Sequence, residues 1–226
     1  MSNYDFYVAD FQHVSLMEYP GKISSIVFTH GCSLRCRYCH NPELVTGREK
    51  VSRLQDFLEY LSGKDIEAVA VTGGEPLLAR NLADFLTDMK ERGMYVKLDT
   101  NGFSVKQLER VCSAGLIDYA AVDLKAFSQN SLKKITRTEA DINDFYTTLA
   151  VLDRYNVPFE VRHTLWEVPS EADVASFAGR APDCLFFLQR IRNAKMLDKT
   201  FDVSGLDDLK AEEIFKKYIR NFSVRG

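Results

Sequence analysis

Three of the five cysteines in this 226-residue chain stand within eight positions, as Cys32, Cys36 and Cys39. A loop with this CxxxCxxC spacing can wrap one compact metal centre, and thiolate ligands favour zinc, copper(I) or iron–sulfur sites. A structural zinc normally takes a fourth Cys or His at a short spacing. His40 adjoins Cys39, but neighbouring residues rarely reach the same ion. A [4Fe–4S] cluster held by three cysteines leaves one iron free to coordinate a small molecule, and we favour this interpretation.

The other two cysteines fit structural roles. Cys112 lies on the apolar side of a predicted helix and Cys184 begins a predicted strand, so we expect both to be buried thiols. An odd number of cysteines without an export signal argues against a disulfide framework. A zinc-binding or electron-transfer iron–sulfur module remains the non-enzymatic alternative.

Strand-like and helix-like segments alternate along the chain, and they must position the cysteines. Apolar runs predict strands at residues 23–29, 68–72, 95–99, 119–124, 159–165 and 185–191. Amphipathic patterns predict helices at residues 53–61, 82–92, 105–114, 142–155, 171–178 and near 209–218. Regular alternation implies parallel strands joined by right-handed crossovers. Six strands are too few for a closed eight-stranded barrel, so we expect an α/β fold with a partial open (β/α)6 barrel.

The division of the chain follows from this pattern. We expect a single domain over residues 1–226, with an N-terminal extension at residues 1–21. The partial barrel would occupy residues 22–192, and residues 193–226 would form a C-terminal loop and helix. No internal repeat, low-complexity tract or flexible linker is visible.

Unusual motifs follow each of the first four predicted strands. They are the cysteine loop, Gly73-Gly74-Glu75-Pro76, Asp99-Thr100-Asn101-Gly102 and Asp123-Leu124-Lys125. A fifth candidate, Arg162, lies within an apolar strand, where an unpaired charge is costly. In a parallel (β/α) barrel these strand ends share one face, where active sites are built. The motifs should therefore meet in one cavity.

Each of these motifs also has a purely structural interpretation. The glycine pair alone could be an ordinary turn between a strand and a helix. Asp99 and Thr100 could cap a helix, and Asp123 with Lys125 could form a solvated ion pair. Arg162 could pair with a carboxylate across the sheet instead of binding a ligand.

Composition excludes several classes of function. The formal net charge is −3 and the pI about 5.9, without the basic footprint of a nucleic-acid-binding domain. No apolar run approaches membrane-spanning length, and residues 1–12 lack the features of a signal peptide. We expect a cytoplasmic protein that binds neither nucleic acid nor membrane.

The loop CSLRCRYC resembles the cluster motif CxxxCxΦC of the radical S-adenosylmethionine (radical SAM) superfamily, with Tyr38 as the aromatic residue. The continuation His40-Asn41-Pro42 and the segment from Tyr19 to Leu44 are similar to glycyl-radical-enzyme activases. These include activating proteins of anaerobic ribonucleotide reductase and of pyruvate formate-lyase. The resemblance covers nearly the whole chain and is weakest beyond residue 191.

The resemblance implies three sets of site residues. The cluster ligands would be Cys32, Cys36 and Cys39. Contacts to S-adenosylmethionine would come from Tyr38, Gly73, Gly74, Glu75, Asp99, Lys125 and Arg162. A weaker expectation is a monovalent cation held by Asp99, Thr100 and Asp123.

The implied function is reductive cleavage of S-adenosylmethionine to a 5′-deoxyadenosyl radical, which generates a glycyl radical on a partner enzyme. Anaerobic ribonucleoside-triphosphate reductase is the first candidate; pyruvate formate-lyase, a small molecule or a peptide are alternatives. Reduced flavodoxin or ferredoxin would supply the electron, with Arg35, Arg37 and Arg48 as a docking surface. Residues 41–52 contain no cysteine, so one cluster per chain is expected.

Overall fold

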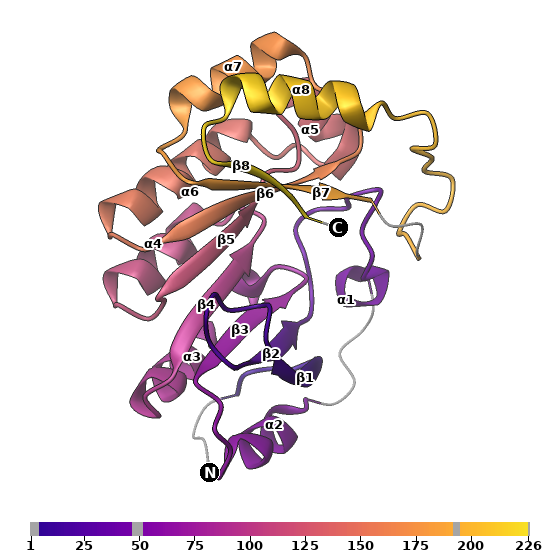
Figure 1. Ribbon diagram of the computed structural model, residues 1–226. Helices are drawn as coiled ribbons and strands as arrows, with labels where there is room; N and C mark the ends of the chain where they lie inside the picture. Colours follow the sequence, from indigo (N-terminus) through magenta and orange to yellow (C-terminus); the bar gives the residue numbers. More distant parts are fainter. Residues whose placement is uncertain (1–4, 47–51, 192–194, 226) are drawn as a thin grey trace.

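The computed structural model describes residues 5–46, 52–191 and 195–225 of the chain. Its centre is one curved sheet whose strands follow each other in sequence order, from β1 at one edge to β8 at the other (Figure 1). Every neighbouring pair is parallel except the first. The strands are β1 (Asp10–Ser15), β2 (Ser24–Thr29), β3 (Ala68–Gly73), β4 (Tyr95–Thr100), β5 (Tyr119–Asp123), β6 (Phe159–Leu165), β7 (Leu185–Arg190) and β8 (Phe222–Arg225).

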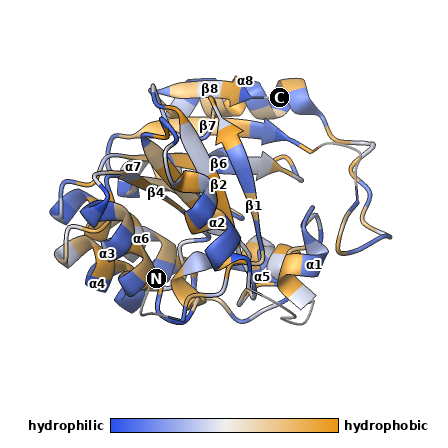
Figure 2. Cartoon of the chain, turned by 90° about the horizontal axis from the view of Figure 1, so that it is seen from below, coloured by the Kyte–Doolittle hydropathy of each residue, from blue (hydrophilic) through white to orange (hydrophobic). Residues whose placement is uncertain are grey.

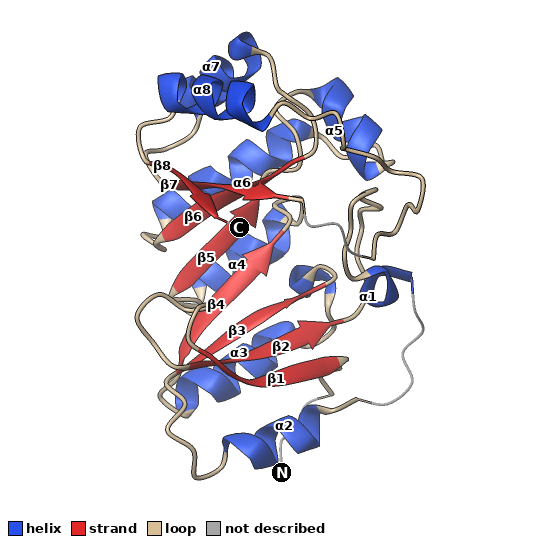
Figure 3. Ribbon diagram, turned by 45° about the vertical axis from the view of Figure 1, so that its right-hand side comes forward, coloured by secondary structure: helices blue, strands red, loops and turns tan. Residues whose placement is uncertain are grey.

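Most of the helices lie on the outer face of this curved sheet, whereas α1 lies beyond the carboxyl end of β2 (Figure 3). They are α1 (Pro42–Thr46), α2 (Leu54–Leu61), α3 (Leu82–Glu91), α4 (Val105–Ser113), α5 (Gln129–Thr136), α6 (Ile142–Arg154), α7 (Glu171–Arg180) and α8 (Asp208–Tyr218), with a 3-10 turn at Pro76–Leu78. Among the described residues, no helix is long and apolar enough to cross a membrane.

The predicted α/β fold with an open, mostly parallel sheet is confirmed. The six predicted strands form within two residues of their expected bounds, and the sheet gains β1 and β8 at its edges. Both edge strands lie in the segments that we assigned to the flanks of the barrel. Their sequences, DFQHVS and FSVR, have exposed residues at most positions, so neither reads as an apolar run.

The core explains why the inner strands hold together. β3 is buried along Ala68–Val71, as expected for a parallel strand covered on both faces. Helices contribute one apolar face each, and in Figure 2 hydrophilic (blue) and hydrophobic (orange) residues alternate along them. A second, smaller cluster packs beneath the cysteine loop and contains Leu34, Cys36, Tyr38 and Trp166. The apolar residues of the cysteine loop therefore pack against Trp166 and against Leu132 and Ile135 of α5.

Candidate active site

A cavity of about 220 Å³ lies at the carboxyl ends of strands β2 to β6. It is lined by most of the predicted site residues, namely Cys32, Cys36, Tyr38, Cys39, Gly73, Gly74, Asp99, Thr100, Asp123 and Lys125. The sequence motifs thus converge as the parallel strands predict. The lining also includes residues that the sequence did not single out for this role, namely Leu34, His40, Asn41, Val45, Thr72, Asn101 and Thr164. Cys112 and Cys184 are not among the lining residues.

The cysteine loop presents three free thiols to this cavity. Its backbone is pinned to the end of α5, because the amides of Arg35 and Arg37 donate to the carbonyls of Thr136 (2.9 Å) and Ile135 (3.0 Å). Burial raises the pKa of Cys36 to about 12, so this thiol stays protonated without a metal. A metal centre must therefore displace a proton from it.

Residues 195–203, which we call the strap, run across the cysteine loop. The amide of Leu197 donates to the carbonyl of Cys39 (2.9 Å), and the amide of Asp198 donates to the carbonyl of Arg37 (3.0 Å). The strap thus pairs backbone to backbone with the segment that carries the third cysteine.

The Asp198 carboxylate fastens the strap through its side chain. It accepts from Arg37 Nε (2.8 Å), from Arg137 and from Thr200 Oγ1 (2.7 Å). Hydrogen bonds from Thr200 and Arg37 lower the pKa of Asp198, so it stays ionised at neutral pH. The Arg37 guanidinium also lies 4.7 Å from the ring centroid of Phe201. Arg37 is thereby engaged within the molecule.

Of the three arginines predicted as a docking surface, Arg35 is exposed. Its guanidinium donates to the carbonyls of Cys32 (2.6 Å) and Leu34 (2.8 Å). Arg48 lies outside the described residues.

Glu75 is fully buried and turned into the protein. Its Oε1 accepts from the Leu77 amide (3.1 Å) and the Thr100 hydroxyl (2.9 Å), while Oε2 accepts from the Asn101 amide (2.7 Å). Burial raises its pKa to about 7, although these hydrogen bonds oppose the shift. Glu75 therefore ties the end of β3 to the end of β4. It is not among the residues that line the cavity.

Gly73 and Gly74 are required by close backbone approach to the neighbouring strand β2. Gly73 has φ +125°, and a Cβ there would lie 2.3 Å from the Thr29 carbonyl oxygen. A Cβ on Gly74 would lie 2.0 Å from the Gly31 carbonyl oxygen. The amides of Gly74 and Glu75 donate to these same two carbonyls. The missing side chains thus let the turn dock against β2 as well as opening its backbone to the cavity.

We expect Gly73→Ala to lower the free energy of unfolding by at least about 2 kcal/mol, because the new Cβ meets backbone that cannot move aside. The matched control is Gly179→Ala in α7, where a Cβ meets nothing within 4 Å. That variant should stabilise slightly, by about 0.5 kcal/mol, since alanine favours a helix. Urea unfolding followed by circular dichroism measures both, and equal effects of the two variants would contradict this account.

A network of buried and partly buried charges joins β4, β5 and β6. Arg162 donates through Nη1 to Asp99 Oδ2 (3.1 Å) and through Nε to Asp123 Oδ1 (2.8 Å). Lys125 Nζ lies 3.1 Å from Asp123 Oδ2, and Lys97 Nζ lies 2.8 Å from Asp99 Oδ1. Arg162 thus pairs with carboxylates across the sheet. It is not among the cavity-lining residues, whereas Asp99, Asp123 and Lys125 are.

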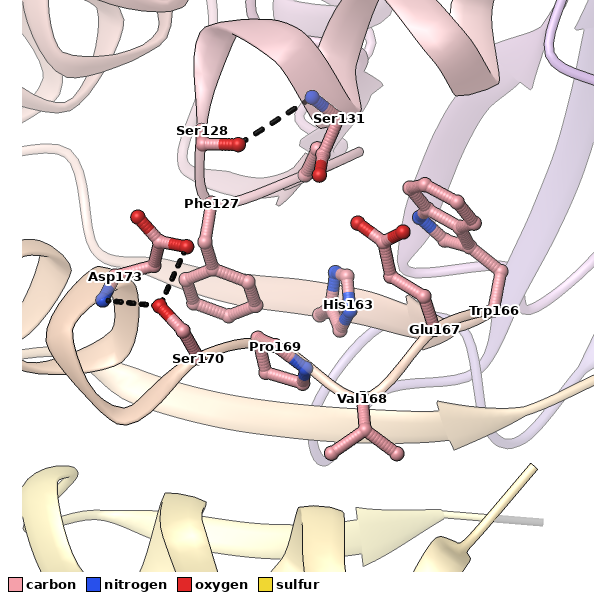
Figure 4. Close-up of a pocket in the computed structure, with 11 residues that line it drawn as sticks. Phe127, Ser128, Ser131, His163, Trp166, Glu167, Val168, Pro169, Ser170 and Asp173 are labelled. Carbon is pink, nitrogen blue, oxygen red and sulfur yellow. Dashed lines mark hydrogen bonds between the residues drawn. The ribbon is translucent and has the colours of Figure 1, made fainter.

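A second cavity of about 230 Å³ lies outside the sheet, between the first turns of α5 and α7 (Figure 4). Ser128 and Ser170 cap these two helices and line it. His163 sits in its wall between Phe127 and Glu167. His163 Nδ1 is 2.8 Å from the Leu124 carbonyl, which can only accept, so the proton of the neutral ring is on Nδ1.

Burial lowers the pKa of His163 to about 4. The unfolded chain binds a proton at this residue near pH 6.5, whereas the folded chain does not until about pH 4. His163 should therefore cost stability progressively as the pH falls from 6.5 to 4, by about 3 kcal/mol in all. In His163→Gln this part of the pH dependence should vanish. Unfolding free energies at pH 7 and pH 4.5 measure it, and parallel losses in both proteins would refute the assignment.

Comparison with known proteins identifies the family of this chain. The family model described as the radical SAM superfamily matches residues 26–180, which is more than half of the chain. The chain belongs to the radical SAM superfamily. The match spans the cysteine loop and the ends of β2 to β6, which surround the cavity. This radical SAM protein is therefore an enzyme, as the sequence predicted.

Several similar curated proteins carry the name of a glycyl-radical enzyme activating enzyme or of a pyruvate formate-lyase-activating enzyme. A protein of Methanocaldococcus jannaschii whose name places it in that group is 28% identical over 94% of this chain and 92% of its own length. The pyruvate formate-lyase-activating enzyme of Listeria monocytogenes is 31% identical over 79% of this chain and 74% of its own. The predicted resemblance to this group is confirmed.

Solved structures support the same radical SAM fold. Streptococcus suis SuiB bound to S-adenosylmethionine superposes with a TM-score of 0.67 at 13% identity, covering 89% of this chain and half of SuiB. A domain of a pyruvate-formate lyase-activating enzyme from Bacteroides vulgatus gives 0.52 at 17% identity, over 71% of this chain and 99% of that domain. At these identities the likeness concerns the fold alone.

Membership in the radical SAM superfamily implies a [4Fe–4S] cluster and S-adenosylmethionine as cofactors, and the cavity fits them. Three free thiols from one short loop line it, and thiolates are the ligands of iron–sulfur clusters. Among the described residues, no three His, Cys, Asp or Glu side chains are arranged to hold a single metal ion. Lys125 and the glycine turn line the same cavity, where a small zwitterion could bind beside the cluster.

Proposed function

We propose that this chain activates a glycyl-radical enzyme, with anaerobic ribonucleoside-triphosphate reductase as the first candidate partner. Cys32, Cys36 and Cys39 would hold the cluster. When bound there, the cluster and S-adenosylmethionine would supply a one-electron reduction of the sulfonium, which would break a carbon–sulfur bond to give methionine and a 5′-deoxyadenosyl radical. That radical would take a hydrogen atom from a backbone glycine of the partner.

The observation that carries this proposal is the meeting of three cysteine sulfurs with the Gly73–Gly74 turn and the charged strand ends in one cavity. The similarity to a protein named as a glycyl-radical enzyme activating enzyme extends over nearly the full chain and supports the proposal. Pyruvate formate-lyase is the second candidate partner, because activating enzymes named for it match over most of the chain.

The cavity residues divide the work of binding S-adenosylmethionine. Gly73 and Gly74 line the cavity, and their backbone carbonyls would accept from the methionine ammonium. Glu75 would act at that end by fixing the turn, since its oxygens already accept from protein donors. Lys125 would meet the methionine carboxylate while Asp123 keeps it charged. Tyr38 would pack beside the cofactor.

Arg162 and Asp99 would contribute to cofactor binding mainly by setting the charge of the pocket. Both belong to the series of ion pairs that ends at Lys125. A monovalent cation on Asp99, Thr100 and Asp123 stays a prediction. It would share the two carboxylates with Arg162, and activity titrated with sodium and potassium chloride at constant ionic strength tests it.

The electron would come from reduced flavodoxin or ferredoxin, both acidic proteins, docking near the exposed Arg35 beside the cysteine loop. Arg37 is the weaker candidate for this contact, because Asp198 and Phe201 already engage it.

The test offers each candidate partner to the reconstituted protein without oxygen. Incubation with reductant and S-adenosylmethionine should give 5′-deoxyadenosine, and electron paramagnetic resonance should reveal a glycyl doublet only with the correct partner. Cleavage of S-adenosylmethionine without a doublet on any glycyl-radical enzyme would favour a small-molecule or peptide substrate. Absence of cleavage in a fully loaded, reduced protein would overturn the proposal in favour of a redox module.

A further inference from the structure

Asn101 lies directly behind the first cysteine of the loop. Its side chain is buried (5% exposed), and Nδ2 is 3.7 Å from Cys32 Sγ, within the longer range of hydrogen bonds to sulfur. The Leu34 amide also donates to this sulfur, at 3.4 Å. Cys32 Sγ thus faces two N–H donors, one from its own loop and one from the end of β4.

Two further contacts fix how the Asn101 amide faces the sulfur. The backbone N–H of Asn101 donates to Glu75 Oε2 (2.7 Å), which holds the residue in place. Its side-chain Oδ1 accepts from the Phe103 amide (3.1 Å). An N–H can only donate, so this partner must be the carbonyl oxygen of the side chain. The amide NH₂ group must then point the other way, at Cys32.

From this arrangement we infer that Asn101 is a positioning residue that donates a hydrogen bond to the Cys32 thiolate and thereby raises the reduction potential of the bound cluster. One-electron reduction adds a negative charge to the cluster and its thiolates, with no bond made or broken. A donor aimed at a ligand sulfur stabilises that added charge, and hydrogen bonds to the sulfurs are among the factors that set cluster potentials. The electron comes from the external low-potential donor.

This inference rests on the cluster assignment and is independent of the partner. Glu75 then has a second role, because it accepts a hydrogen bond from the backbone of Asn101, the residue that donates to Cys32. The ends of β3 and β4 would thus tune the centre that the loop after β2 holds.

The decisive variants remove the donor in two ways. Asn101→Leu deletes it without adding charge, while Asn101→Asp keeps an acceptor for the Phe103 amide and turns an oxygen toward the sulfur. A redox titration of the reconstituted protein, followed by electron paramagnetic resonance, measures the midpoint potential of the cluster. Each variant should have a more negative midpoint potential than the unmodified protein, and the shift should be larger in Asn101→Asp. A three- to tenfold shift of the reduction equilibrium in Asn101→Leu corresponds to about 30 to 60 mV for one electron.

Thr148→Val provides the matched control. Thr148 is 1% exposed, and its hydroxyl donates to the Gly102 carbonyl (2.9 Å), so the variant perturbs the same turn without touching the donor. It should lower stability and leave the potential unchanged. An unchanged potential in Asn101→Leu with a full complement of iron, or an equal shift in Thr148→Val, would overturn the inference.

A second measurement needs no cluster. In the metal-free protein, mass spectrometry can follow iodoacetamide alkylation at each cysteine. Loss of the donor disfavours the reactive thiolate, so Asn101→Leu should slow alkylation of Cys32 about threefold relative to Cys112. If Asn101→Leu fails to take up iron, an unchanged alkylation rate at Cys32 overturns the inference.

Discussion

Cys36→Ala is expected to yield a folded protein that neither retains the cluster nor cleaves S-adenosylmethionine. Its thiol is buried (8% exposed) beneath the loop, beside Leu34 and Tyr38. Loss of even an outer partner of a metal ligand costs about 10- to 100-fold in affinity or activity, so loss of a ligand should cost more than about 100-fold. Iron analysis after anaerobic reconstitution and 5′-deoxyadenosine yield measure the two effects.

Cys112→Ala is the matched control for this prediction. Cys112 is as buried as Cys36 (5% exposed) but sits on α4, away from the cavity lining. Both substitutions remove a buried sulfur, so their packing costs should be similar, whereas only Cys36→Ala should abolish iron binding. Full iron and activity in Cys36→Ala would refute the assignment of this ligand.

The high pKa of Cys36 adds a pH dependence to cluster assembly. Burial raises this pKa to about 12, so a proton must leave as iron binds. Cluster reconstitution should therefore become more complete between pH 7 and pH 9. The absorbance of the reconstituted protein near the thiolate-to-iron band, followed across this range, measures it.

The inner strands could be predicted from the sequence because a strand that is buried on both faces has a continuous run of apolar residues. The segments that escaped prediction lack such a signal. α5 has the sequence QNSLKKIT, which is short and mostly polar, and only Leu132, Ile135 and Thr136 are buried. β1 alternates weakly because it is an exposed edge strand.

The site was predictable to the extent that residue type and strand position decide it. The cysteines and Lys125 face the cavity as expected. Glu75 shows the limit of prediction from sequence, because the same sequence is compatible with a carboxylate that faces a ligand and with one that faces the protein backbone. Asn101 stands in the motif that was singled out after β4, but its role depends on a contact with Cys32, 69 positions away.

The contact between the strap and the cysteine loop is the largest feature of the site that the sequence did not predict. The segment from residue 193 to 206 reads as loop, and nothing local in it indicates a partner. Its attachment to the cysteine loop depends on the contact of Asp198 with Arg37, 161 positions earlier. Such pairings come from the fold and leave no periodicity in a single sequence.

Arg162→Met should destabilise the folded protein by about 3 to 5 kcal/mol at pH 7, because it leaves the buried Asp99 and the partly buried Asp123 without their shared guanidinium. The Arg162 side chain is 12% exposed and Asp99 8%. Lys133→Ala is the control, since the Lys133–Glu139 pair is exposed and should contribute less than about 1 kcal/mol. Urea unfolding at pH 7 compares the two variants.

The pH dependence separates lost charge pairing from lost packing in Arg162→Met. Burial alone would raise the pKa of Asp123, but the charges of Arg162 and Lys125 outweigh it and lower the pKa to about 2. A depressed folded pKa gives stability that is present above the unfolded value of 3.8 and is lost as the pH falls through about 2. The deficit of Arg162→Met should therefore be largest at pH 7 and shrink toward pH 3. Adding Asp123→Asn should restore part of it, because the second substitution removes the charge that the first left unpaired. A deficit independent of pH, with no recovery in the double variant, would mean that Arg162 acts through packing alone.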